Sequence, residues 1–340
     1  MIAKLQPNRV RRTYLGGGRI DAYTGFTPPA DGALRPEDWM ASTTTAFNGT
    51  LEIEGEGLGR LEDGRLVKDV VGTLPILVKL LDSDERLVIQ AHPTVPYAKA
   101  KLNSPVGKTE CWYFLDCSPD ACVYLGFKEG VTRESFQKAF WDFYRAQSSQ
   151  SDSRTVEQLP NPLLPLLHRV PVKPGDFVFV DGGVPHAIGG GCFMIELQEP
   201  SDLMVVAERF TPSGREIPEK KLHCGLGFEE MFNVYEYVGY SYESLCAKYV
   251  RRAGSGGGAP AVAEGKGIVR ILGPELTDKF SMYRLTDGAQ LPLARPGAVA
   301  VVTSGAGTLN GLAVQKGDRL VVSSESELSL AGSATVVVCV

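Results

Sequence analysis

Two of the four histidines in this 340-residue chain, His92 and His186, lie beside prolines at the ends of apolar runs. In the segment Gln90-Ala91-His92 the two polar side chains are separated by one residue, so on a strand they point to the same face. With Glu110 and His186 brought in from other strands, Gln90 and His92 would form a mixed nitrogen and oxygen ligand set. Zinc takes histidine and carboxylate ligands and keeps one position open when it is catalytic. The set in this spacing favours a metal site.

Each of these residues also has a plainer interpretation when it is taken alone. His92 and His186 could be core histidines whose ring nitrogens are satisfied by hydrogen bonds, and Gln90 could be an ordinary polar residue of a strand. The metal hypothesis therefore depends on all four side chains meeting in space.

The elements that must position the first three ligands are predicted to be strands. Residues 75–81 form an apolar run typical of a buried strand, residues 82–85 are turn-forming, and residues 86–90 are the next apolar run. These runs predict a hairpin that delivers Gln90 and His92. Glu110 begins a further strand over residues 109–115, on the same face as Trp112.

His186 follows a Lys-Pro-Gly-Asp turn at residues 173–176, an apolar run and a glycine turn. Three glycines, 189–191, and a strand over residues 192–197 are predicted to close a second hairpin after it. Glu196 and Gln198 share one face of that strand. The clearest helix is predicted over residues 134–145, where aromatic side chains recur at helical spacing and indicate a core-facing stripe.

At 340 residues the chain is long enough for two domains, and 38 glycines with 22 prolines favour a turn-rich, mostly β protein. We expect a metal-binding domain over residues 1–253 with a helical insertion near 128–168. A glycine-rich linker or loop is expected over 254–264, followed by a C-terminal β domain over 265–340, which contains no histidine.

Charge and cysteine content narrow the class of protein. The net charge of −5 and the absence of a basic block argue against nucleic-acid binding. No apolar run approaches membrane-spanning length, and the N-terminus lacks the apolar core of a signal peptide. Seven cysteines without a Cys-x-x-Cys pair are expected in a reducing compartment. These features favour a cytoplasmic protein without membrane or nucleic-acid partners.

The two halves of the candidate site resemble the cupin motifs. Gly175 followed by residues 181–186, Asp-Gly-Gly-Val-Pro-His, is similar to the second cupin motif with Asp in the place of Pro. The Gln-x-His-Pro variant of the first motif, followed by Gly-Lys-Thr-Glu at 107–110, resembles type I mannose-6-phosphate isomerases. The resemblance continues through residues 196–202 and into the tail at 304–309 and 314–318, so it covers nearly the whole chain.

The resemblance implies a cupin fold, that is, a double-stranded β-helix or jelly roll, with a small helical insertion. It implies one zinc ion per chain and interconversion of mannose 6-phosphate and fructose 6-phosphate through a metal-stabilised cis-enediol. The substrate would be a small sugar phosphate, and the protein a monomer or weak homodimer. It makes Gln90, His92, Glu110 and His186 the zinc ligands, and it places Lys108, Glu196 and Asp202 beside them. We expect Glu196, Lys108 and Arg209 in catalysis, and Lys108, Asp202, Arg209 and Arg215 in substrate binding.

Two positions depart from the family pattern. Val88 stands where many members have serine, and Val206 stands where members have an arginine that contacts substrate. Arg209 and Arg215 are the nearest arginines. These departures leave open two alternatives, namely an isomerase or epimerase acting on another sugar or sugar phosphate, and a non-catalytic cupin that binds a sugar.

Overall fold

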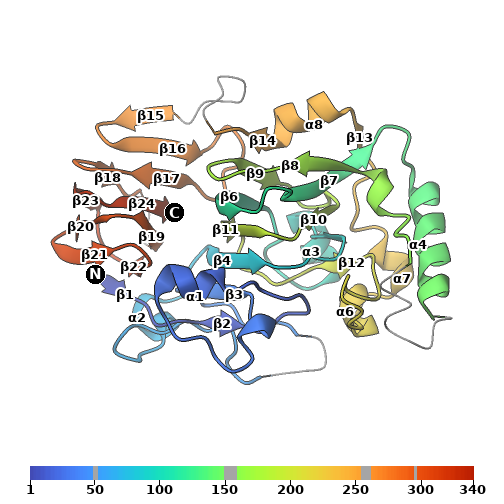
Figure 1. Cartoon of the computed structure of the whole chain (residues 1–340), viewed down its shortest axis with the longest axis horizontal. Coiled ribbons are helices and arrows are strands. Elements are labelled where there is room, and N and C mark those ends of the chain that lie inside the picture. Colours follow the sequence, from blue (N-terminus) through green and yellow to red (C-terminus); the bar gives the residue numbers. More distant parts are fainter. Residues whose placement is uncertain (49–52, 149–158, 254–261, 295–296) are drawn as a thin grey trace.

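The computed structural model describes residues 1–48, 53–148, 159–253, 262–294 and 297–340. Antiparallel strands dominate these residues and form four sheets, two in each of two β units. Figure 1 shows the two units side by side along the longest axis, with the C-terminal strands at one end. The prediction of a mostly β protein is confirmed.

The larger unit has a seven-stranded sheet and a six-stranded sheet. The first contains, in spatial order, β14 (Val250–Arg251), β9 (Phe177–Val180), β6 (Glu110–Cys117), β11 (Cys192–Gln198), β4 (Leu77–Ser83), β3 (Glu37–Met40) and β2 (Arg9–Val10). The second contains β12 (Val205–Val206), β5 (Gln90–Ala91), β10 (His186–Ile188), β7 (Cys122–Lys128) and β13 (Gly239–Tyr240), with β8 (Leu167–Pro171) also paired to β7.

Both predicted hairpins are wrong. β4 lies in the seven-stranded sheet, but β5, which follows the turn, lies in the six-stranded sheet. β10 and β11 are divided between the sheets in the same way. The turns carry the chain from one sheet to the other, as in a jelly roll. The predicted strand over 86–90 overlaps the observed strand β5 only at Gln90, although Leu87 and Ile89 make backbone hydrogen bonds to Ile188 and Ala207.

The smaller unit contains a seven-stranded and a four-stranded sheet. The seven-stranded sheet contains, in spatial order, β1 (Ile2–Lys4), β22 (Arg319–Val322), β19 (Ala298–Ser304), β24 (Thr335–Cys339), β17 (Met282–Leu285), β16 (Ile268–Leu272) and β15 (Val262–Gly265). The four-stranded sheet contains β18 (Gln290–Pro292), β23 (Glu327–Gly332), β20 (Ala306–Leu309) and β21 (Leu312–Gln315). The N-terminal strand β1 therefore belongs to the sheet that the C-terminal residues build.

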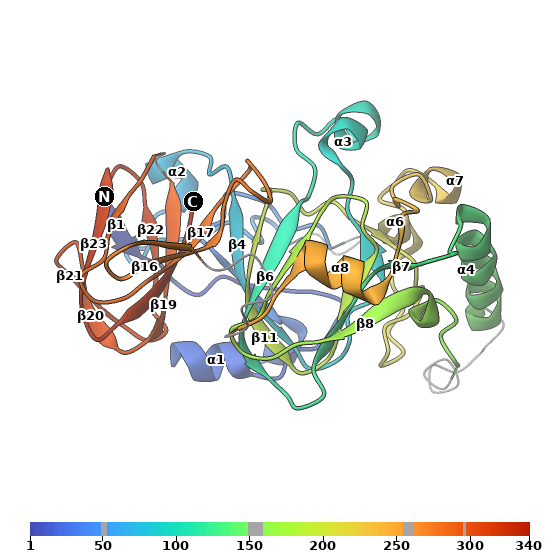
Figure 2. The ribbon, with the colours of Figure 1, turned by 90° about the horizontal axis from the view of Figure 1, so that it is seen from above.

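Helices are short apart from α4. They are α1 (Arg19–Thr24), α2 (Val67–Val71), α3 (Val95–Lys101), α4 (Arg133–Ser148), α6 (Glu219–Leu222), α7 (Phe228–Met231) and α8 (Tyr242–Tyr249), with two 3-10 turns, η1 (Gly32–Leu34) and η2 (Leu164–Leu166). The predicted helix is confirmed as α4, and Thr132 accepts a hydrogen bond from the Ser135 backbone at its start. Figure 2 shows α4, α6 and α7 at the end of the molecule away from the C-terminal strands. In the described residues no helix is long and apolar enough to cross a membrane.

One hydrophobic core cluster joins the two β units. It contains strand residues of the larger unit such as Trp112 and Ile195, and residues of the smaller unit such as Val299 and Val321. We keep the division into domains at 1–253 and 265–340 as a proposal. Most of the predicted linker, residues 254–261, lies outside the described residues.

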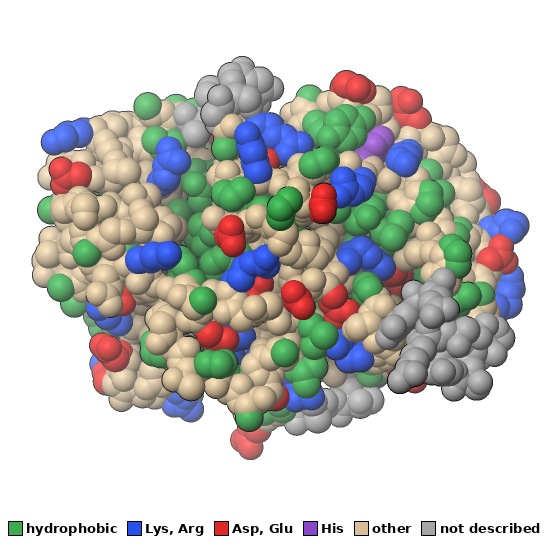
Figure 3. Space-filling model, viewed as in Figure 1, with side chains coloured by type: hydrophobic (Ala, Val, Ile, Leu, Met, Phe, Trp, Pro, Cys, Tyr) green, Lys and Arg blue, Asp and Glu red, His purple; other side chains and the backbone are tan. Residues whose placement is uncertain are grey.

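Lysine and arginine side chains are interspersed with acidic side chains on the face shown in Figure 3. This distribution agrees with the small net charge of −5. That face therefore has no large patch of positive charge, which is the surface that binds nucleic acids.

Candidate metal centre and cavity

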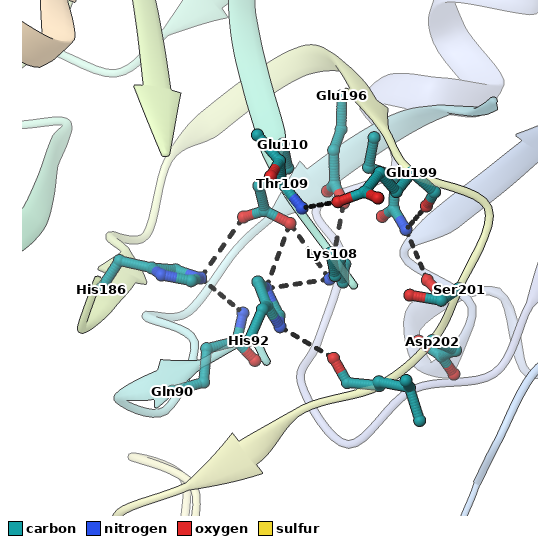
Figure 4. Close-up of polar contacts among 12 residues, drawn as sticks. Gln90, His92, Lys108, Thr109, Glu110, His186, Glu196, Glu199, Ser201 and Asp202 are labelled. Atoms are coloured by element: carbon teal, nitrogen blue, oxygen red, sulfur yellow. Dashed lines mark hydrogen bonds and ion pairs between the residues drawn. The ribbon is translucent and has the colours of Figure 1, made fainter. Parts of the chain in front are cut away.

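The four predicted ligands meet between the two sheets of the larger unit. Gln90 on β5 and His186 on β10 are directly opposite each other on neighbouring antiparallel strands. His92 follows β5 immediately, and Glu110 is the first residue of β6 in the other sheet. Figure 4 shows the side chains of all four pointing toward one another.

Glu110 is the centre of the cluster. Its Oε2 lies 3.1 Å from His92 Nε2, and its Oε1 lies 3.3 Å from His186 Nε2. One ligand atom from each of these three residues can be chosen so that all lie within 4.8 Å of one another. The amide nitrogen of Gln90 lies 3.3 Å from His186 Nε2. All four side chains are buried, so a cation held there would be largely shielded from solvent.

Both imidazoles are held in the form that a metal ligand needs. His92 Nδ1 lies 2.9 Å from the Leu203 carbonyl oxygen, and His186 Nδ1 lies 2.9 Å from that of Val184. A carbonyl only accepts, so each Nδ1 carries the proton and each Nε2 presents a lone pair to the cluster. Burial, with Lys108, lowers the pKa of His92 to about 3, although Glu110 opposes the shift. Burial also lowers the pKa of His186.

The arrangement leaves an acceptor without a donor. Glu110 Oε2 is buried and receives no hydrogen bond of acceptable geometry, although Lys108 Nζ lies 3.0 Å away. Lys108 Nζ, which also lies 3.0 Å from His92 Nε2, offsets part of the repulsion between the carboxylate and the two imidazole lone pairs. A metal cation between the three ligands would offset the rest. The donor set therefore fits a divalent ion that takes nitrogen and oxygen ligands.

Glycines allow the ligand-bearing segments to approach closely. A Cβ atom on Gly107 would lie 2.6 Å from the Pro93 carbonyl oxygen, and one on Gly182 would lie 3.0 Å from Thr94 Cα. The backbone nitrogen of Gly183, at a φ of 88°, donates a 2.7 Å hydrogen bond to the His92 carbonyl. The segments that carry His92, Glu110 and His186 are therefore packed backbone against backbone.

A cavity opens beside the cluster. Its empty volume, counted with the solvent at its mouth, is about 580 Å³. The charged residues that line it are Arg12, Glu37, Lys79, Lys108, Glu110, Glu196 and Lys221, together with Gln90. Val88 and Val206, the two departures from the family pattern, also line it, so the cavity has an apolar wall beside a charged one.

Glu196 lies in the charged wall, on β11. Its Oε1 accepts a 3.0 Å hydrogen bond from Lys79 Nζ and lies 3.9 Å from Lys108 Nζ. Burial raises its pKa, and Lys79 and Lys108 only partly oppose the shift. A buried carboxylate with a raised pKa beside a ligand cluster is a candidate proton-transfer group.

Asp202 is tied to an arginine of the N-terminal segment. Arg12 donates to both carboxylate oxygens, at 2.8 and 2.9 Å, and its Nε lies 3.2 Å from Glu37. Asp202 also accepts from the Phe47 backbone nitrogen at 2.8 Å. Its oxygens are therefore engaged in orienting Arg12, which lines the cavity, whereas Asp202 does not.

Like Asp202, the predicted substrate residues Arg209 and Arg215 do not line the cavity. Arg209 is bound to Glu216 at 2.7 Å and lies over the Tyr144 ring. Arg215 is held by Glu85 and by the Thr13 carbonyl. The structure does not bring either arginine to the metal cluster, and their roles in catalysis and substrate binding stay predictions.

Three cations that the sequence reasoning missed line the cavity instead, Arg12, Lys79 and Lys221. Lys79 interrupts the apolar run over residues 75–81, and a lysine in a buried strand is a signal that could have found it. Arg12 and Lys221 stand in polar segments that carry no comparable signal.

The fold and the buried cluster define a cupin-type β protein with a candidate metal centre. No family model matches the chain. It is similar to two Bacillus subtilis (strain 168) proteins, "Probable mannose-6-phosphate isomerase GmuF", 39% identical over 128 residues, and "Mannose-6-phosphate isomerase ManA", 37% identical over 131 residues. Each match takes in 38% of this chain, and it spans only about a third, 35%, of the relative's length.

Solved structures extend the likeness over the whole chain. A mannose 6-phosphate isomerase from Bacillus subtilis has a TM-score of 0.70 at 20% identity, covering 100% of this chain and 99% of that one. A zinc-bound mannose 6-phosphate isomerase has a TM-score of 0.70 at 14% identity, covering 99% and 98%. The cupin fold predicted from the motifs is confirmed, and so is the resemblance to mannose-6-phosphate isomerases.

Proposed function

We propose that this chain is a metal-dependent aldose–ketose isomerase that interconverts mannose 6-phosphate and fructose 6-phosphate. The observation that carries the proposal is the buried cluster of His92, Glu110 and His186 at the edge of a cation-lined cavity. The similarity to proteins named mannose-6-phosphate isomerase, in sequence over part of the chain and in fold over all of it, supports this substrate over other sugars.

Gln90, His92, Glu110 and His186 would hold one zinc ion. Gln90 would complete the set by a half-turn of its amide, which would point the oxygen instead of the nitrogen toward the cluster. When bound, the ion would supply a Lewis acid that polarises the substrate carbonyl. A solved mannose 6-phosphate isomerase of this fold is described as zinc-bound, which supports the choice of metal.

The proton chemistry would fall to the residues of the charged wall. The reaction needs a base that removes the C2 proton and returns it to C1 through a cis-enediol. Glu196 suits this role because it is buried in the wall of the cavity and is not a metal ligand. Its raised pKa also lies closer to neutral pH, where a base transfers protons most effectively. Lys79 would hold the Glu196 carboxylate in place, and Lys108 would donate to a substrate oxygen.

A second enzyme function is an isomerase or epimerase of another sugar or sugar phosphate. The observation that favours it is the apolar wall formed by Val88 and Val206. Members of the mannose-6-phosphate isomerase family that the sequence resembles have a serine and an arginine at these two positions, so this cavity offers the substrate fewer polar contacts there. The partner in either case would be a small sugar or sugar phosphate. A cytoplasmic location and a monomer or weak homodimer stay proposals.

An isomerase assay with purified, zinc-loaded protein tests the function. The expected result is the formation of fructose 6-phosphate from mannose 6-phosphate, with deuterium from heavy water appearing at C1 of the product. The matched variant is Glu110→Gln, which keeps the size of the side chain but removes a charged ligand, and it should lose zinc and activity together. Turnover of a free sugar or a different sugar phosphate alone would favour the second function. If the protein binds these sugars and sugar phosphates but converts none of them, both enzyme functions are contradicted.

A further inference from the structure

Lys221, the third residue of helix α6, is a buried lysine of the cavity wall whose ammonium has no partner among the described residues. Its side chain is 3% exposed. Within the described residues it makes no side-chain hydrogen bond, and no carboxylate oxygen lies within the 4.0 Å of an ion pair. Burial and Arg12 lower the pKa of Lys221 to about 8, against the opposing effect of Asp202. A buried charge without a partner is costly, so its presence in a cavity indicates an anion that arrives from outside.

The other cations of the cavity already have carboxylate partners. Arg12 pairs with Asp202 at 2.8 Å, and Lys79 pairs with Glu196 at 3.0 Å. Lys108 lies 3.0 Å from the Glu110 carboxylate. Among the described residues that line the cavity, Lys221 is the cation without a carboxylate partner.

Glu37, the remaining carboxylate of the wall, is satisfied by other groups. Tyr14 donates to it at 2.7 Å and Trp39 at 2.6 Å. Burial would raise the pKa of Glu37, but Arg12 and Lys79 outweigh that effect and lower it to about 2. Glu37 therefore stays ionised without needing Lys221.

The charges of the whole site point the same way. Among the described residues, the cavity is lined by four cations, Arg12, Lys79, Lys108 and Lys221. They are matched in number by four carboxylates, those of Glu37, Glu110 and Glu196 in the lining and that of Asp202, which pairs with Arg12. A divalent metal on Glu110 would therefore leave two positive charges uncompensated. A phosphate monoester carries a charge of about −1.5 to −2 at pH 7. It would restore neutrality.

The apolar wall explains how Lys221 reaches the cavity. Val206 packs in a small hydrophobic cluster with Ile217, which precedes helix α6, and with Leu222, the last residue of that helix. Helix α6 contacts strand β12, which bears Val206. A valine at this position thus packs α6 against the cavity wall, and Lys221 and Val206 line the same cavity.

We propose that Lys221 is the residue that binds the phosphate group of the substrate in this chain. The proposal rests on the proposed function for the identity of the sugar, but not for the recognition of a phosphate. The ammonium would donate to the phosphate oxygens, and Arg12, held by Asp202, would add positive potential beside it.

The test is phosphate binding by the zinc-loaded protein, measured by titration calorimetry with inorganic phosphate and with fructose 6-phosphate. Lys221→Gln should weaken both by roughly 10- to 100-fold, as expected for the loss of one charged hydrogen bond. Lys221→Arg should retain most of the affinity. Lys220→Gln is the matched control, because it makes the same change one residue away on an exposed side chain, and it should bind like the unmodified chain.

Thermal unfolding separates this role from a structural one. Removing a buried ammonium that has no partner should leave the melting temperature of Lys221→Gln unchanged or higher. A lower melting temperature with unchanged phosphate affinity would show a structural role and overturn the proposal. Failure of the unmodified protein to bind inorganic phosphate or fructose 6-phosphate would also overturn it. Phosphate binding that depends on Lys221 in a protein without isomerase activity would support Lys221 while refuting the proposed function.

Discussion

The charged wall of the cavity shows how single residues divide the work. Glu110 belongs to the ligand cluster, where two imidazole lone pairs face its carboxylate. Glu196 lies beside that cluster but contacts lysines instead of histidines. Two carboxylates in one site can therefore take different roles, because their neighbours differ.

The residue-scale test of this division is Glu196→Gln. The amide keeps the size of the side chain but cannot accept a proton, so kcat should fall by roughly 10²- to 10⁴-fold. Zinc content, measured by elemental analysis, should be unchanged because Glu196 is not in the ligand cluster. Exposed Glu229→Gln should leave both quantities unchanged. A variant with normal kcat would remove Glu196 from the mechanism.

Protonation of the two candidate ligands should make the metal-free protein sensitive to acid. The pKa of His92 is lowered from 6.5 to about 3 in the folded protein, and that of His186 is lowered too. At a pH between the folded and unfolded pKa values, the unfolded chain binds protons that the folded chain does not. The free energy of unfolding therefore decreases as the pH falls below about 6.5. Urea unfolding of chelator-treated protein should show a slope of up to about 1.4 kcal/mol per pH unit for each histidine.

His92→Gln is the control for the acid effect, because it removes one of the two titrating groups. Its unfolding free energy should depend less steeply on pH over the same range. An unmodified protein whose stability is the same at pH 7 and at about pH 5 would contradict the neutral, buried state of these histidines.

At the scale of elements, close packing of the loops decides where the ligands meet. Gly107 precedes Lys108 and Glu110, and it lies against the backbone that follows His92. No larger residue fits between these segments, since an added Cβ would lie 2.6 Å from the Pro93 oxygen and 2.8 Å from the Val95 nitrogen.

Gly107→Ala should therefore disturb the metal centre without touching a ligand. We expect a loss of about 1–3 kcal/mol in unfolding free energy from the forced backbone shift, together with weaker zinc binding in a calorimetric titration. Gly265→Ala on the exposed strand β15 is the matched control, because its Cβ would lie no closer than 3.7 Å to Ile268. Equal zinc affinity in both variants would refute the positioning role of Gly107.

The sequence predicted the metal cluster better than the elements that carry it. Gln90 and His92 share a strand face whatever sheet they join, so the period of two was sufficient to group them. The hairpins failed because turn residues after β4 and β10 indicate only that the chain reverses, not which sheet receives it. Lys221 could not be predicted, because its burial depends on α6 packing against Val206, a contact between distant segments.

At the scale of the molecule, the two β units are joined by more than a chain connection. β1 pairs with β22, and Arg319 forms a buried ion pair with Asp38 of the larger unit. Tyr23 donates a 2.6 Å hydrogen bond to the Val302 carbonyl. These contacts predict that the units unfold together.

Arg319→Met tests this coupling. It leaves the Asp38 carboxylate buried without its charged partner, although the Asn8 backbone still donates to it. We expect a loss of about 3–5 kcal/mol in the free energy of urea unfolding. Arg65→Gln breaks an exposed ion pair with Asp63 and should leave the free energy of unfolding almost unchanged. A loss as small for Arg319 as for Arg65 would mean that the units are only loosely joined.

The most direct test of the account is a zinc titration of the chelator-treated protein, with bound metal and isomerase activity followed in the same samples. The account predicts that both rise together and stop at one zinc ion per chain, and that Glu110→Gln shows neither rise. Full activity with mannose 6-phosphate in the metal-free protein, or tight zinc binding that survives in Glu110→Gln, would contradict it.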